Sequence, residues 1–128
     1  MKKIINRAYE DVLADVPAAL QTEGFGVLTE IDLAQTLKKK LDVDFRRYKI
    51  LGACNPALAY RALSSDLDVG VMLPCNVVVY EIEPGVTVVN AIDPMATLAA
   101  SDAALRPIAE DVKARLARAL ELLSADSS

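Results

Sequence analysis

Apolar residues recur at helical spacing near both ends of the chain. Across residues 9–23 they fall three and four positions apart, which is the spacing of one helical face. Gly24 follows as a helix stop, whereas Pro17 predicts either a kink or a later helix start. Ser101 has the side chain of an N-cap, and a second stripe after it predicts a long amphipathic helix: Leu105, Ile108, Val112, Leu116, Leu120 and Leu123.

Between these helices the pattern changes to that of β-strands. Residues 25–32 alternate along a strand, residues 46–54 form a second, and residues 73–82 and 86–92 form a hairpin around a Pro-Gly turn. Residues 2–5 have room for only a very short strand. N-cap residues stand where helical turns are expected to begin, and a proline follows two of them directly: Asp32, Asn55 and Asp93.

The order of these elements predicts one α+β domain over residues 1–123. A helix, four strands with short helical insertions and a long final helix suit a mostly antiparallel sheet with two main helices packed on one face. The other face of the sheet is then left to solvent or to a second subunit. Residues 124–128 are expected to form a disordered tail.

Composition removes several kinds of chemistry. The 128 residues include no histidine, which excludes nucleophile–histidine pairs, histidine metal ligands and a histidine proton shuttle within this chain. The net charge of −4 argues against nucleic acid and anionic membranes as partners. No stretch approaches the ~20 apolar residues of a membrane span, and two cysteines make no disulfide framework, so we expect a reduced, cytoplasmic protein.

Basic residues gather in one region of the chain. Six of the 14 lysines and arginines lie between positions 38 and 49. Such a run suits a phosphate or an acidic partner, and it equally suits a solvated surface.

Each of the two cysteines is followed directly by an asparagine. Cys54 ends one predicted strand and Cys75 begins the next, so antiparallel pairing of these strands brings the two thiols close together. Gly52 leaves room near Cys54 for another group. Two interpretations stay open: a dithiol that forms a reversible disulfide or, with a second subunit, a soft-metal site, and two buried cysteines that act as small apolar residues.

Polar side chains extend this candidate site. Asn55 and Asn76 can hold a ligand or orient a thiol, although Asn55 is also placed to cap a helix. Glu30 and Asp32 share a strand face, as a pair of carboxylates for acid–base chemistry would. Asp93 is a third candidate acid, and like Asp32 it is equally placed to cap a helical turn.

Four segments in this order resemble the Domain of Unknown Function 302 family: Gly24-Phe-Gly-Val-Leu-Thr-Glu-Ile-Asp32, Leu51-Gly-Ala-Cys-Asn-Pro56, Leu73-Pro-Cys-Asn-Val77 and Ala91-Ile-Asp-Pro94. The resemblance implies a TATA-binding-protein-like fold, β-α-β(4)-α, with an antiparallel sheet, and it suggests a homodimer. It implies no DNA binding, because a shared fold does not carry a shared function. No activity, substrate or cofactor comes with the matching residues.

Three functions from different classes fit these observations. The first is a homodimeric module that binds a small molecule or a soft metal ion, with Cys54 and Cys75 as metal ligands and a wider ligand site formed by Asn55, Asn76, Glu30, Asp32 and Asp93. The second is a thiol-redox enzyme, which needs an exposed cysteine of low pKa. The third is a protein–protein interaction module with structural cysteines. We carry the first forward as the main hypothesis.

Overall fold

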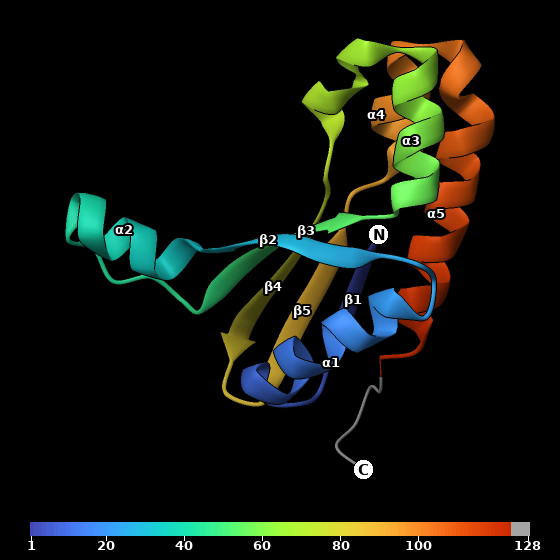
Figure 1. Cartoon of the computed structure of the whole chain (residues 1–128). Coiled ribbons are helices and arrows are strands. Elements are labelled where there is room, and N and C mark those ends of the chain that lie inside the picture. Colours follow the sequence, from blue (N-terminus) through green and yellow to red (C-terminus); the bar gives the residue numbers. More distant parts are fainter. Residues whose placement is uncertain (124–128) are drawn as a thin grey trace.

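The structure, a computed structural model, describes residues 1–123 and centres on one antiparallel sheet. Five strands lie in the order β1-β5-β4-β3-β2 (Figure 1). Their bounds are β1 (Lys2–Ile5), β2 (Gly26–Asp32), β3 (Tyr48–Cys54), β4 (Cys75–Glu83) and β5 (Val86–Ala91). The predicted α+β class and antiparallel sheet are confirmed, and β1 pairs with β5 to complete one edge of the sheet.

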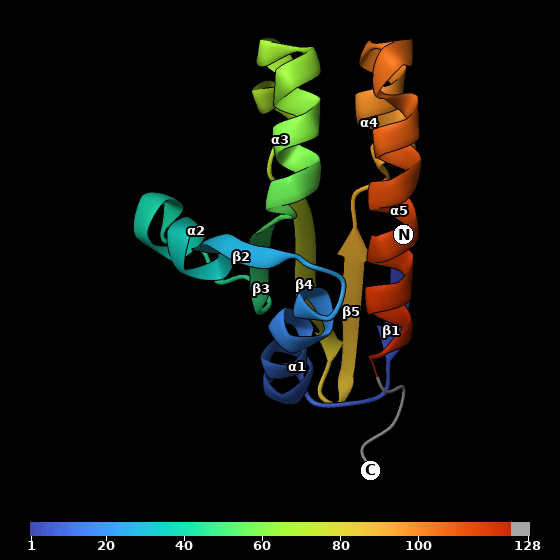
Figure 2. The ribbon, with the colours of Figure 1, turned by 45° about the vertical axis from the view of Figure 1, so that its right-hand side comes forward.

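Five α-helices and two short 3-10 helices connect and cover these strands. Their bounds are α1 (Tyr9–Gln21), α2 (Leu33–Leu41), α3 (Pro56–Ser65), α4 (Pro94–Ser101) and α5 (Arg106–Glu121), with η1 (Leu67–Met72) and η2 (Ala103–Leu105). The two main helices, α1 and α5, lie on one face of the sheet, as the sequence predicts, and α3 and α4 lie beyond one end of it (Figures 1 and 2). Helix α1 begins at Tyr9 and contains Pro17, so the later start is wrong.

The prediction that Ser101 caps the final helix is also wrong. Ser101 is the last residue of α4, and its hydroxyl donates to the Leu98 carbonyl. Asp102 provides the next cap by accepting from the Ala104 amide, and α5 begins only at Arg106 without a side-chain cap. Asp93 and Pro94 therefore begin a separate helix, α4, rather than a single helical turn.

The core lies between the sheet and helices α1 and α5. Alternation along β3 and β4 turns one set of side chains toward the helices, where Leu51 pairs with Val77 in the sheet and both are 2% exposed or less. Val12 of α1 and Leu116 of α5 meet this face with no exposed surface. Each such side chain stabilises the fold by about 1.5–3 kcal/mol, so the helices are held mainly by this apolar layer.

The opposite face of the sheet has no helix over it among the described residues. The register places Ile31, Ile50 and Val78 in one row there, and the rings of Tyr48 and Tyr80 stack with centroids 5.2 Å apart. Helix α2 buries none of its residues and projects from the sheet as an arm in both views (Figures 1 and 2). We call this surface, together with α2, the open face.

None of the helices within residues 1–123 is both long enough and apolar enough to cross a membrane. Residues 124–128, predicted as a disordered tail, lie outside the described residues.

Candidate functional site

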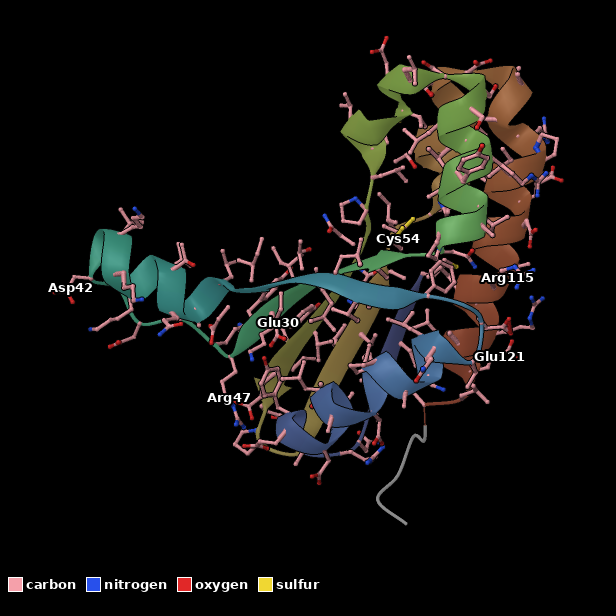
Figure 3. The ribbon with its side chains drawn as sticks, viewed as in Figure 1. Glu30, Asp42, Arg47, Cys54, Arg115 and Glu121 are labelled. Atoms are coloured by element: carbon pink, nitrogen blue, oxygen red, sulfur yellow. The ribbon has the colours of Figure 1, made fainter. Side chains whose placement is uncertain are left out.

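The two cysteines meet at one end of the sheet. Strands β3 and β4 are antiparallel neighbours, and Ala53 pairs with Cys75, so Cys54 lies one residue beyond that pair. Both thiols are free, Cys75 is 6% exposed and Cys54 is half-buried. Figure 3 shows Cys54 where β3 runs into the first turn of α3. The predicted meeting of the two cysteine segments follows from this pairing.

Cys54 and Cys75 line the same pocket, which we call the thiol pocket. Apart from Asn55, its remaining walls are apolar side chains from the sheet and from helices α3, α4 and α5: Phe25, Ala53, Leu58, Ala59, Ala62, Leu73, Leu98, Ile108 and Val112. The enclosed cavity measures about 20 Å³, which is the size of one water molecule or a methyl group. Counted out to its mouth, and so including open solvent, the empty space is about 320 Å³.

Burial keeps the Cys75 thiol protonated. Desolvation, followed by the nearby Cys54, raises the pKa of Cys75 from 9.0 to about 11. The thiolate, not the thiol, is the nucleophile and the metal ligand, so Cys75 is a weak candidate for either role near neutral pH.

Asn55 and Asn76 have different surroundings. Asn55 caps α3 by accepting from the Leu58 amide at 3.3 Å, and its Nδ2 donates to the Glu23 carbonyl at 3.1 Å. Its side chain therefore ties α3 to the loop before β2 and leaves its amide little capacity for a ligand. Asn76 is exposed and pairs with Gly52 in the sheet, which turns its side chain toward the open face and away from the thiol pocket.

Two of the three candidate acids, Glu30 and Asp32, lie away from the cysteines, whereas Asp93 follows β5 at the end of the sheet where Cys75 begins β4. Gly26 at the start of β2 pairs with Cys54, whereas Asp32 at the other end of β2 pairs with Lys49. Asp32 caps α2 through the Gln35 amide at 3.0 Å. The Lys49 ammonium lies 2.6 Å from a Glu30 carboxylate oxygen.

The Asp93 carboxylate caps α4 and pairs with a lysine of α5. Its carboxylate accepts from the Met95 amide at 2.9 Å and from Lys113 at 3.0 Å. Lys113, with help from this amide, lowers the pKa of Asp93. The capping roles that the sequence predicts for Asp32 and Asp93 are thus present in the fold.

A metal ion finds few ligands here. Within residues 1–123, no three or more cysteine, aspartate or glutamate side chains lie close enough together to hold one. Two thiols alone make an incomplete site for zinc or another soft metal, which favours four ligands. A metal at Cys54 and Cys75 would therefore require ligands from a second subunit.

Gly52 is needed for close packing beside the thiol pocket. A Cβ atom at this position would overlap the Thr29 hydroxyl and lie 2.7 Å from Cγ of Pro74. The sequence predicted that Gly52 leaves room for another group. That room is taken by the Thr29 side chain of β2 and by the Pro74 ring, which directly precedes β4. These side chains close the open-face side of the sheet next to Cys54 and Cys75.

A second hollow lies at the other end of β3. It has a volume of about 380 Å³, and its polar lining includes Tyr9, Asp32, Gln35, Arg47 and Lys49. We call it the charged hollow. Sequence reasoning placed Tyr9 on an apolar helix face and counted Arg47 and Lys49 in a basic run, so it did not predict that these side chains meet. The one available signal was the presence of a tyrosine, whose hydroxyl needs a partner, at a core position.

The fold and the thiol pocket define a small α+β protein with two free cysteines at one end of its sheet. The profile of the Domain of unknown function DUF302 matches residues 1–123, and the chain belongs to this family. It is similar to the crystal structure of an uncharacterized conserved protein DUF302 from Bacillus stearothermophilus, with a TM-score of 0.86, 34% identity and 96% of each chain covered. None of the curated proteins matches the chain.

Proposed function

We propose that this protein is a homodimeric module that binds a small, largely apolar molecule in the thiol pocket. The observation that carries the proposal is that both cysteines of the chain line one pocket whose other walls are almost entirely apolar. Ligand sites of this kind combine apolar walls with a few polar groups that orient the ligand. Here the two thiols are weak hydrogen-bonding groups, and the amide of Asn55 is already bonded to Leu58 and Glu23, so the pocket suits a largely apolar ligand.

The chemistry of the thiols favours binding over catalysis or metal coordination. The raised pKa of Cys75 leaves its thiol uncharged near neutral pH. An uncharged thiol behaves as a small polarizable apolar group and contacts hydrocarbon without a desolvation cost. A thiol-redox enzyme would instead need a cysteine of lowered pKa.

The size of the pocket limits the ligand. The enclosed part takes a methyl-sized group, and the remainder of the ligand occupies the mouth, where Cys54 and Ala59 are half-buried. A ligand with one narrow apolar end suits this shape, because the space of about 320 Å³ out to the mouth includes open solvent.

The open face supports the homodimer. A nine-residue helix is marginal alone in water, yet α2 buries no residue against its own chain. Large apolar side chains on and beside this surface are 43–56% exposed: Ile4, Ile31, Val43, Phe45 and Ile82. A second copy that pairs the same surface about a two-fold axis covers the arm and these side chains together.

The ligand proposal is tested with toluene as a probe and two-dimensional amide NMR. We expect toluene to shift the amide signals of Cys54, Leu58 and Leu98 selectively and to slow alkylation of Cys54 by iodoacetamide. Ala59→Leu fills the mouth and should abolish both effects. Ala57→Leu, an exposed position on the same helix outside the pocket, is the matched control and should preserve them.

Two outcomes would reject the ligand proposal. One is the absence of any selective shift with toluene, and the other is a shift that survives Ala59→Leu. A mass loss of two daltons that reductant reverses would instead favour the redox enzyme.

The dimer is tested separately by sedimentation equilibrium. We expect the mass of two chains for the unmodified protein and of one chain for Ile31→Glu, which places a charge on the open face, on edge strand β2 next to α2. Glu121→Lys, an exposed change on α5 away from that face, is the control and should remain dimeric. A monomer at micromolar concentration of the unmodified protein would reject the dimer.

A further inference from the structure

The two edges of the sheet differ in how well they are protected against pairing with another strand. Strand β1 forms one edge with only four residues, two of which are lysines. Strand β2 forms the other edge with seven residues, and none of them is lysine, arginine or proline. Short strands, lysines and prolines are the usual means of keeping an edge from pairing, so β2 presents the less protected row of backbone N–H and C=O groups.

Strand β2 has two partial protections, a bulge and two acidic side chains. The bulge lies at Leu28, between the pairing of Val27 and that of Thr29 with β3. Glu30 and Asp32 alternate with an isoleucine at the end of the strand. Like charges directly opposite each other destabilise a pair of strands, so these acids disfavour every register that brings them together.

The arm that follows β2 has an apolar stripe without a buried contact. Leu33, Leu37 and Leu41 recur every four residues and so lie along one side of α2. None of the three is buried within the described residues, and Leu41 is 66% exposed. A helix of nine residues is marginal alone in water, so this stripe needs a surface from outside its own chain.

A third hollow lies beside the start of β2, at the end of the strand opposite to the arm (Figure 1). We call it the strand-start hollow. It has a volume of about 500 Å³, and its lining includes Pro17 and Gln21 of α1, Phe25 and Val27 at the start of β2, and Pro56 of α3. Both prolines are exposed there, so the hollow offers apolar surface to another chain.

Antiparallel pairing of two β2 strands brings the arm of one copy to this hollow in the other. A two-fold axis beside Thr29, the middle residue of β2, pairs the full length of both strands and places Gly26 opposite Asp32 of the second copy. Leu28 then lies opposite Glu30, and no acidic residue of the strand faces another. An axis beside Glu30 would instead place the two Glu30 side chains opposite each other, which is unfavourable. The charge pattern of β2 thus favours the axis at Thr29.

We propose that two copies of this chain pair antiparallel along β2, so that the arm of each copy packs its leucine stripe into the strand-start hollow of the other. In this register the residues that follow Asp32 of one copy run past Gly26 of the second, which lines that hollow. Backbone hydrogen bonds then join the two sheets into one, and the apolar stripe is removed from water. The inference rests on the homodimer of the proposed function and gives the position of its two-fold axis.

The first test is oxidative cross-linking of Thr29→Cys with oxidised glutathione. Directly opposite residues of an antiparallel pair have Cα atoms about 4.5–5.5 Å apart, which a disulfide can span. We expect a disulfide-linked dimer on non-reducing electrophoresis. The unmodified protein controls for the native thiols of Cys54 and Cys75, and Ile82→Cys controls for an exposed open-face position outside β2; both should stay unlinked.

The second test compares two charges at Leu28, which is 68% exposed, so neither change should disturb the folded chain. Leu28→Glu places an acid opposite Glu30 on both sides of the axis, and sedimentation equilibrium should show dimerisation about tenfold weaker. Leu28→Lys places the opposite charge there and should dimerise at least as tightly as the unmodified protein. Both variants replace the same apolar side chain, so only the sign of the charge separates them.

The outcomes distinguish this pairing from the homodimer itself. A dimer in which Thr29→Cys stays unlinked, or in which Leu28→Glu and Leu28→Lys associate equally, would overturn the pairing along β2 and leave the homodimer intact. A monomeric unmodified protein would reject the homodimer and the pairing together. The toluene test of the thiol pocket is independent of both results.

Discussion

At its last residue strand β3 lines a pocket of apolar side chains, whereas at Lys49, near its first, it lines a hollow of charged groups. The thiol pocket is enclosed by three helices and the sheet, and burial there suppresses ionisation of Cys75. The charged hollow lies under the exposed arm, where water reaches Arg47 and Asp32 and ion pairs persist. One strand thus meets two dielectric environments within seven residues.

Two aspartates of the same local type have different surroundings and therefore different roles. Asp32 and Asp93 both cap helices, but Asp93 is neutralised by Lys113 while Asp32 is left without a cation in the described residues. Because Lys113 neutralises the Asp93 carboxylate, this side chain serves to hold α4 and α5 in place. The Asp32 cap, by contrast, is balanced by water rather than by a salt bridge within the described residues.

The largest expected difference in stability between the thiol pocket and the charged hollow comes from removing buried apolar atoms. Leu58→Ala truncates a side chain that is 6% exposed in the wall of the thiol pocket, and we expect it to lower the free energy of unfolding by about 3 kcal/mol. Leu67→Ala, at a position that is 85% exposed, is the control and should change it by less than about 0.5 kcal/mol. Urea denaturation measures both, and similar small losses would contradict a packed thiol pocket.

The pH dependence of stability should sharpen the contrast next. The Cys75 thiol titrates near pH 9.0 when unfolded and near pH 11 when folded, so the unfolded state loses its proton first as pH rises. The stability that this thiol contributes is complete below pH 9 and is lost between pH 9 and 11, by about 2 kcal/mol. Cys75→Ala should lack this part of the decline. Identical slopes for the two proteins from pH 9 to 11 would show that Cys75 is not desolvated.

Overpacking beside the thiol pocket should have a comparable effect. Gly52→Ala forces a Cβ atom against Thr29 and Pro74, and we expect it to lower the free energy of unfolding by about 2 kcal/mol. Gly26→Ala has open space around its new Cβ atom and serves as the matched strand control, with a change below about 0.5 kcal/mol. Equal urea midpoints for the two variants would place Thr29 or Pro74 elsewhere.

The smallest effect is expected at the charged hollow. Lys49→Met breaks the ion pair with Glu30, whose side chain is 51% exposed, and should lower the free energy of unfolding by about 0.5 kcal/mol. The difference from the unmodified protein should shrink further in 1 M NaCl, because salt screens exposed charges. A loss that reached the size of Leu58→Ala would mean that this end is packed like the core.

Local signals in the sequence predicted several of the helix caps around the thiol pocket and the charged hollow. Asn55 caps α3 and Asp32 caps α2, as expected from a side chain that bonds an amide two or three residues later. Residues 55–74, which include α3 and η1, separate β3 from β4, so the antiparallel pairing that joins the cysteine segments was supported by the family resemblance rather than by local signals. Ser101 misled the prediction, because Asp102, one residue further on, supplies the competing cap.

By itself, the sequence determined the α+β class and most helix caps, because these depend on local patterns, whereas the adjacency of Cys54 and Cys75 depended on antiparallel pairing across residues 55–74. Alternation along β4 already turns Asn76 away from Cys75, and only the tertiary structure decided which of the two faces the helices cover. It also decided that Tyr9 meets Asp32 and Arg47, which come from three separate elements. Such meetings depend on how α1 packs against the sheet, and no spacing along the chain records that packing.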